Sequence, residues 1–295
     1  MSTSPPPQTH AEPQEPAEPD AERGTEVSDV PPWPTWTAPA AIGAGFGLWI
    51  VVSIVVGIGA KVGGSSLTHP SPAVTLIASF LTDASFVVAA IYFARLVTRI
   101  RPSDFGFRRV RWQTVVAGVV TAGIGYYVLT AIYASLLHLH GNEKLPKELG
   151  VGKSNAALIA ASIFVCVVAP IFEEFFFRGF IFGTLRRIRV GGTRWLGTLI
   201  AALITAVLFG AAHTGSAPAR YLIPLGIFGF VLCLLRWSTR SLYPCMALHS
   251  INNSLALGQT QLHWPAGEIV ALIVGSLFVI AALTGPLAGR TPAIA

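Results

Sequence analysis

Long apolar stretches separated by short polar ones occupy most of the chain after about residue 38. Most of them are close to the roughly 20 residues with which an α-helix crosses a bilayer. The seventh stretch is short and carries several polar residues, so its hydropathy is the weakest. The pattern predicts an all-α polytopic membrane protein with about eight transmembrane helices. Their expected spans are 39–60, 72–98, 114–138, 155–185, 196–213, 219–235, 241–257 and 267–288.

The first 38 residues have a different composition. They are rich in Pro, Glu, Asp, Ser and Thr and hold little apolar surface, which is typical of disordered segments. They also lack the basic start and apolar core of a signal peptide. We expect residues 1–38 to be a disordered cytoplasmic tail, with Trp33 and Trp36 at its junction with the membrane. Residues 39–290 would then form one eight-helix transmembrane domain.

The basic residues support this topology. The chain has 20 Lys and Arg against 14 Asp and Glu, a formal net charge of +6. With the tail and every second loop in the cytoplasm, fourteen basic residues fall on that side, five on the other, and Arg178 within the membrane. This asymmetry follows the positive-inside rule and predicts cytoplasmic termini in a bacterial plasma membrane. The basic residues form no separate domain, so we expect the lipid bilayer as a partner and no nucleic acid.

Three charged residues interrupt the fourth span: Glu173, Glu174 and Arg178. Each costs about 2.5–3.5 kcal/mol near the bilayer centre, so all three should face other helices or water. A purely structural explanation is a buried Glu174–Arg178 pair at i, i+4, but it leaves Glu173 unexplained. Pro170, just before this stretch, can kink the helix and open room for water beside Glu173.

A few other polar residues lie within the spans. His213 ends the fifth span, while His249 and Asn253, four residues apart, share one face of the seventh. Each alone could simply hydrogen-bond a neighbouring helix. Together with Glu173 they are the groups needed to polarise a water and hold an oxyanion. We therefore expect the fourth, fifth and seventh spans to be adjacent around one polar cavity. Asp83 in the second span is expected to pair with a polar group or cap a bend, without a catalytic role.

The three motifs resemble those of a known family. Residues 173–180, EEFFFRGF, look like the E-E-x-x-x-R motif of the CPBP family of CAAX prenyl endopeptidases and bacteriocin-processing membrane proteases, also called Abi. FGAAH, ending at His213, is similar to its F-x-x-x-H motif, and HSINN, from His249, to its H-x-x-x-N motif. They occur in the family's order on separate apolar segments, over about residues 170–255. The tail and the first two spans lie outside the resemblance.

The resemblance implies an intramembrane endopeptidase. It makes Glu173 the general base that activates water, with His213 helping to hold that water. His249 and Asn253 would stabilise the oxyanion, and Glu174 and Arg178 would form a supporting pair. The expected substrates are peptides or proteins, with prenylated and membrane-embedded ones both open.

The family has been described both as zinc-dependent and as a metal-free glutamate protease. We expect no metal, because no acidic residue of the spans looks free to orient the histidines. Glu174 is expected to be taken by Arg178, and Asp83 is far away in sequence. The alternative is a catalytic Zn²⁺ held by Glu173, His213 and His249, with water in the fourth position.

Two other classes of function stay open. One is a non-catalytic immunity, scaffold or partner-binding protein on the same fold, and the other is a proton-coupled transporter that uses Glu173 and the histidines as a relay. The chain has no H-E-x-x-H, Gly-x-Ser-Gly or Gly-x-Gly-Asp motif of other membrane proteases. Peptide hydrolysis is the function that uses all the polar residues of the three motifs.

Overall fold

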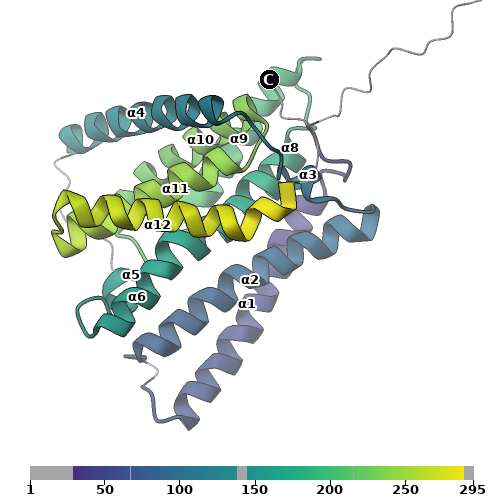
Figure 1. Ribbon diagram of the computed structural model, residues 1–295. Coiled ribbons are helices and arrows are strands. Elements are labelled where there is room, and N and C mark those ends of the chain that lie inside the picture. Colours follow the sequence, from purple (N-terminus) through teal and green to yellow (C-terminus); the bar gives the residue numbers. More distant parts are fainter. Residues whose placement is uncertain (1–28, 67, 138–144, 215, 289–295) are drawn as a thin grey trace, which may run out of the picture.

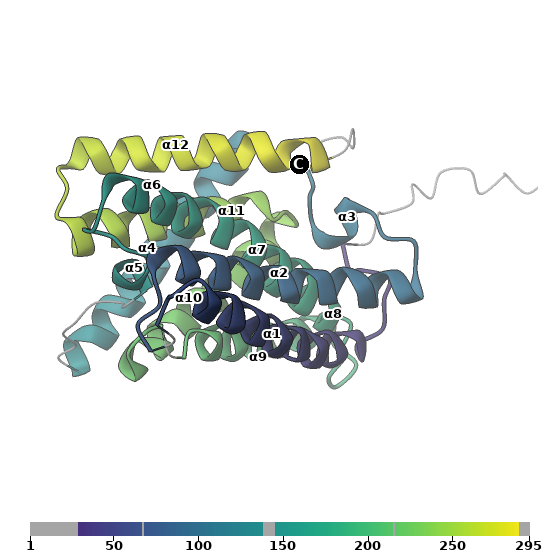
Figure 2. The same ribbon diagram turned by 90° about the horizontal axis from the view of Figure 1, so that it is seen from below.

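The computed structural model describes residues 29–66, 68–137, 145–214 and 216–288. Over these residues the protein is a bundle of helices without a strand, which confirms the all-α prediction (Figure 1). Helices α1 (Thr37–Val62) and α2 (Pro72–Val97) pack as a pair along one edge, and α12 (Ala266–Thr284) lies away from α1 (Figure 2). Helices α4 (Trp112–Leu137), α9 (Arg194–Ala212) and α10 (Leu222–Thr239) form the opposite part of the bundle.

Seven helices of the described chain are long and apolar enough to cross a membrane. Large apolar side chains on their outward faces are exposed, as expected for contact with lipid. On α1 the exposed residues include Ile50, Ile54 and Ile58, and on α12 Val270, Val274 and Phe278. The candidate spans are Thr37–Val62, Pro72–Val97, Trp112–Leu137, Asn155–Leu185, Arg194–Ala212, Ala219–Thr239 and Ala266–Ala288.

The predicted eighth span, residues 241–257, is not among these candidates. It contains α11 (Tyr243–Leu255), which has 13 residues and is therefore about 20 Å long, short of the roughly 30 Å of a hydrocarbon core. A π-helical segment, η4 (Ala256–Leu262), extends it. Most of α11 is buried among other helices, and a helix enclosed by protein needs neither the length nor the hydropathy of a lipid-facing span. By length and hydropathy seven helices of the described chain are candidates, and α11 with η4 is the eighth of the about eight predicted segments, enclosed by protein.

The fourth span is one continuous helix with irregular winding. It consists of α6 (Asn155–Ile163), η1 (Phe164–Val168), α7 (Ala169–Glu173), η2 (Glu174–Phe182) and α8 (Gly183–Leu185), of which η1 and η2 are π-helical. The Ser154 hydroxyl begins it by accepting a hydrogen bond from the Ala157 backbone N–H at 3.1 Å. Such π-helical turns are frequently found at functional sites, and here they flank Glu173 on both sides.

Pro170 explains how this helix receives α11. Proline has no N–H, so the carbonyls four and five residues before it, those of Cys166 and Val165, receive no hydrogen bond from position 170. The Ser250 hydroxyl donates to the Cys166 carbonyl at 2.7 Å, and the Asn253 amide nitrogen donates to the Val165 carbonyl at 2.8 Å. The proline therefore creates a docking site for α11 beside Glu173.

The end of the predicted tail is packed against the bundle. The Trp33 side chain is fully buried, donates a 2.6 Å hydrogen bond to the Thr184 hydroxyl and stacks on Phe180. Asp29 pairs with Arg186 at 2.7 Å. Burial raises the pKa of the Asp29 carboxyl, but the charge and hydrogen bond of Arg186, together with the charges of Arg236 and Arg240, outweigh it and hold that pKa below its usual value.

The prediction of a disordered segment 1–38 is thus wrong for residues 29–38, which are packed and lead into α1, while residues 1–28 lie outside the described part. Four short helices complete the described chain: α3 (Pro102–Phe105), α5 (Leu145–Glu148), η3 (Ala219–Tyr221) and η5 (Gly285–Ala288).

Candidate active site

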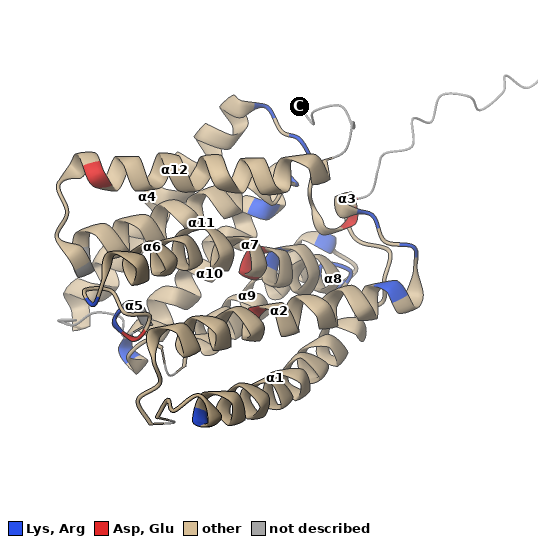
Figure 3. Ribbon diagram, turned by 60° about the horizontal axis from the view of Figure 1, so that its bottom comes forward, with Lys and Arg blue, Asp and Glu red and all other residues tan. Residues whose placement is uncertain are grey.

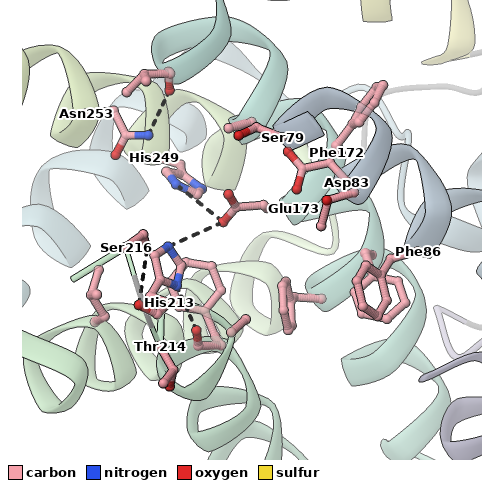
Figure 4. A pocket seen from close by; sticks show the side chains of 18 of the residues that line it. Ser79, Asp83, Phe86, Phe172, Glu173, His213, Thr214, Ser216, His249 and Asn253 are labelled. Atoms are coloured by element: carbon pink, nitrogen blue, oxygen red, sulfur yellow. Dashed lines mark hydrogen bonds and ion pairs between the residues drawn. The ribbon is translucent and has the colours of Figure 1, made fainter. Parts of the chain in front are cut away.

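A cavity of about 1210 Å³ lies between α1, α2, α7, α9, α10 and α11. Its wall includes Glu173, His213, His249 and Asn253, which come from three separate elements (Figure 4). The predicted convergence of the fourth, fifth and seventh spans is therefore present in the structure. The chemical roles of the four residues stay predictions.

Glu173 occupies the last position of α7 and faces the cavity. Its Oε2 atom lies 4.0 Å from the Nε2 atoms of both His213 and His249. That oxygen is buried and has no hydrogen-bond partner among the described residues. A buried carboxylate oxygen without a partner is costly unless a water, a proton or a ligand reaches it.

Glu174 points to the other side of the same helix. Its Oε1 atom pairs with Arg178 at 2.8 Å, and both side chains are fully buried. The guanidinium also donates to the Gly229 carbonyl at 3.2 Å and lies 4.3 Å from the centre of the Phe209 ring. The predicted supporting pair is present and is held by a carbonyl and an aromatic face.

The same carboxylate orients His249. The His249 Nδ1 atom lies 2.7 Å from Glu174 Oε1, and the imidazole is almost fully buried. A carboxylate paired with Arg178 only accepts hydrogen bonds, so Nδ1 carries the hydrogen. The expectation that Arg178 leaves Glu174 unable to orient a histidine is wrong, because one oxygen of Glu174 serves both partners.

His213 is oriented by its own helix. At the end of α9 the His213 backbone N–H donates to the Gly210 carbonyl, so it does not bond the Phe209 carbonyl four residues before it. The Phe209 carbonyl lies instead 2.9 Å from Nδ1 of the His213 ring. A carbonyl only accepts, so this Nδ1 also carries the hydrogen. In their neutral forms both histidines therefore direct an Nε2 lone pair toward Glu173 Oε2. Three acceptors around one space call for a donor between them, such as a water molecule or a proton.

Asn253 is partly engaged elsewhere. One of its amide hydrogens goes to the Val165 carbonyl, and its Oδ1 lies 3.4 Å from the Asn252 amide nitrogen. The second amide hydrogen is left for the cavity. The hydrogen bond to Val165 fixes where that amide lies, as an oxyanion donor requires.

Asp83 also faces this cavity, which the sequence did not predict. It lies on α2 near Ser79, within range of an electrostatic interaction with Glu173 (Figure 4). Within the described chain it forms no hydrogen bond or ion pair, so the expected polar pairing or bend cap is wrong. A signal was present in the sequence: Thr75, Ser79 and Asp83 recur every four residues and form a polar stripe on α2.

A zinc ion fits this arrangement poorly. Within the described residues no group of three or more His, Cys, Asp or Glu is spaced to hold a metal ion. Ligand bonds of about 2.0–2.2 Å in a tetrahedral site place donor atoms about 3.3 Å apart, closer than the 4.0 Å from Glu173 Oε2 to each Nε2. We therefore derive no step through a metal. The two Nδ1 atoms are nevertheless oriented by a carboxylate and a carbonyl, so the expected lack of orienting groups is not a reason against zinc.

Comparison with known proteins agrees with the motifs. Residues 155–255 match the family model of the type II CAAX prenyl endopeptidase Rce1-like proteins, which confirms the resemblance to the CPBP family. An uncharacterized 24.3 kDa protein of Escherichia coli is 29% identical over 150 residues, covering 48% of this chain and 67% of that protein. No solved structure gives a significant match.

The matched segment contains all the predicted site residues, from Glu173 to Asn253, and leaves out Asp83. The chain is thus a multi-pass membrane protein with a segment that matches the model of a protease family.

Proposed function

We propose that the protein is an intramembrane endopeptidase that hydrolyses peptide bonds with a water activated by Glu173. The observation that carries this proposal is the unpartnered Glu173 Oε2, which faces the Nε2 atoms of His213 and His249 at 4.0 Å. A water between these three acceptors can donate one hydrogen to the carboxylate and the other to an imidazole. Its oxygen lone pair is then free to attack a carbonyl carbon.

In the first step the water oxygen bonds to the scissile carbonyl carbon and a water proton moves to Glu173. The carbonyl oxygen becomes an oxyanion. The free amide hydrogen of Asn253 and, when its ring is protonated, the Nε2–H of His249 are the donors for it. Glu174, bonded to Nδ1 of His249, stabilises that protonated ring and fixes its orientation.

The cavity suits a peptide that carries a large apolar group. Its volume exceeds the roughly 300–1000 Å³ of ordinary ligand pockets. Aromatic side chains from several helices line it together with the polar residues: Phe46, Phe86, Phe172, Phe176, Phe209 and Phe228. We propose peptide or protein substrates, with prenylated C-termini and membrane-embedded segments as the two classes to test first.

The experiment compares purified wild type with Glu173→Gln on a peptide library that includes prenylated members. We expect the wild type to cleave some peptides and the variant to lose at least about 100-fold in rate, the typical contribution of a general base. Glu268→Gln makes the same chemical change at an exposed residue of α12 outside the cavity and should match wild type. Binding of peptides without cleavage would favour the non-catalytic function, and proton flux in vesicles the transporter.

Zinc is the alternative cofactor, favoured by the orientation of the two Nδ1 atoms. We propose a metal-free reaction, because the carboxylate and imidazoles already provide the base and the hydrogen-bonding groups. Active protein should keep its rate after chelator treatment and dialysis. Activity that is lost with chelator and restored by one equivalent of zinc would instead make Glu173, His213 and His249 ligands.

A further inference from the structure

Besides Glu173, two acids line the proposed catalytic cavity, Asp83 and the exposed Glu148 of α5, and both lie outside the segment that matches the protease family. Asp83 lies on α2, whereas Glu173 lies on the helix that packs against it. Figure 4 shows both carboxyl groups, with Ser79 beside Asp83, around the same space. Figure 3 shows an acidic segment on α2 and another on α7, both within the bundle.

The surroundings of the two carboxyl groups differ. Glu173 has two imidazole nitrogens at 4.0 Å, one on each of two other helices. Asp83 has no such neighbour, since it forms no ion pair or hydrogen bond in the described chain. No Lys or Arg is among the described residues that line the cavity, and α1 contributes only Ile42, Phe46, Trp49 and Ser53 to it.

This difference decides where a proton resides. Two carboxyl groups that face one poorly solvated space do not both ionise readily, and the group nearer to positive charge loses its proton first. Glu173, whose Oε2 lies 4.0 Å from two imidazole nitrogens, is the group placed to take a proton from water. Asp83, which has Ser79 beside it and forms no ion pair in the described chain, is the group placed to hold a proton. One carboxyl is thus prepared as a base and the other as an acid.

Peptide hydrolysis needs such an acid, because an amide nitrogen is a poor leaving group until it is protonated. We propose that Asp83 is the general acid that protonates the leaving amine. This role rests on the proposed function. When the C–N bond of the tetrahedral intermediate breaks, the nitrogen takes the proton of Asp83 and leaves as an amine. The proton that Glu173 took from water then passes to Asp83 through a water molecule. The net reaction adds one water across the peptide bond and restores both carboxyl groups.

The test separates leaving groups that need a proton from those that do not. Purified wild type and Asp83→Asn are given two substrates with the same acyl segment, one a peptide amide and the other a p-nitrophenyl ester. The ester leaves as a stable anion. We expect Asp83→Asn to lose about 10²–10⁴-fold in kcat/KM on the amide and less than about tenfold on the ester. Glu173→Gln should lose activity on both, because both need an activated water.

Two further variants keep the result interpretable. Asp83→Glu retains a proton donor. Its kcat/KM on the amide should therefore be at least about tenfold higher than that of Asp83→Asn. Glu268→Gln, outside the cavity, should behave as wild type. Equal losses of Asp83→Asn on amide and ester would overturn the proposal, and so would a change confined to KM, which would make Asp83 a substrate-binding residue. A wild type inactive on both substrates would refute the proposed function itself and Asp83's role with it.

Discussion

Glu173 and Glu174 are neighbours in sequence but lie in different environments. Consecutive residues of a helix point about 100° apart, so one carboxylate faces the cavity and the other faces the interior between helices. Glu174 has Arg178 and His249 on a single oxygen, at 2.8 and 2.7 Å. Glu173 Oε2 has no hydrogen-bond partner in the described chain. The two residues should therefore respond differently to removal.

We predict that Glu174→Ala destabilises the protein and Glu173→Ala does not. Without Glu174 the guanidinium of Arg178 is left buried without its counter-charge, a loss of about 3–5 kcal/mol. Without Glu173 a charge that is costly to bury disappears, so the fold should be as stable as wild type or more stable. Thermal unfolding in detergent measures both. Equal destabilisation by the two changes would mean that both carboxylates hold the structure.

The sequence could identify most of these residues but not their pairing. Charged and polar residues within apolar spans stand out, which is how Glu173, His213 and His249 were found. The contact between Glu174 and His249 joins residues 75 positions apart, and no local pattern predicts its geometry. Asp83 was missed as a cavity residue for the same reason, although its stripe with Thr75 and Ser79 already marked a polar face of α2.

At the scale of elements, the irregular fourth helix and the short α11 depend on each other. The π-helical winding of η1 gives the Phe164 carbonyl a partner five residues ahead, at Ala169. For the next carbonyl, that of Val165, the residue five ahead is Pro170, which has no N–H to offer. Side chains of α11 take over this carbonyl and the following one. The docking of α11 in turn sets the position of His249, one residue before Ser250.

We predict that Ser250→Ala destabilises the protein by about 1 kcal/mol, because the buried Cys166 carbonyl loses a 2.7 Å hydrogen bond. The control is Ser238→Ala on α10, an exposed serine that bonds a carbonyl of its own helix, where the change should stay below about 0.5 kcal/mol. The difference in unfolding free energy between the two variants is the measurement. Equal effects would show that the Ser250 contact does not hold α11 in place.

A comparison of the predicted spans with the observed helices shows what hydropathy can predict. Lipid-facing helices such as α1 and α12 must be apolar over a full bilayer thickness, so their spans were found within a few residues. The helix α11 is surrounded by protein and escapes that requirement, which is why the hydropathy of its predicted span was the weakest. Tryptophan is enriched at membrane interfaces, which is why the sequence predicts Trp33 at the membrane junction. Its contacts with Thr184 and Phe180 depend on the distant end of α8.

At the scale of the whole molecule, the two ends of the bundle differ in charge. Basic segments gather around α3 and α8 (Figure 3), and the described chain both begins and ends there, since Asp29 pairs with Arg186 and η5 contacts α3. The cavity approaches the opposite end, where Pro70 of the α1–α2 connection and Thr214 and Ser216 of the α9–α10 connection line it. If the more basic end is cytoplasmic, substrates reach Glu173 from the other side of the membrane.

Cysteine labelling on intact cells tests this orientation. We predict that Thr214→Cys reacts with a membrane-impermeant maleimide added outside the cells, because Thr214 is exposed at the cavity. Thr193→Cys, the same change at an exposed residue of the basic α8–α9 loop, should react only after the cells are permeabilised. The three native cysteines are buried, so wild type provides the unlabelled background. The reverse labelling pattern would place the cavity mouth, and therefore the access of substrates, on the cytoplasmic side.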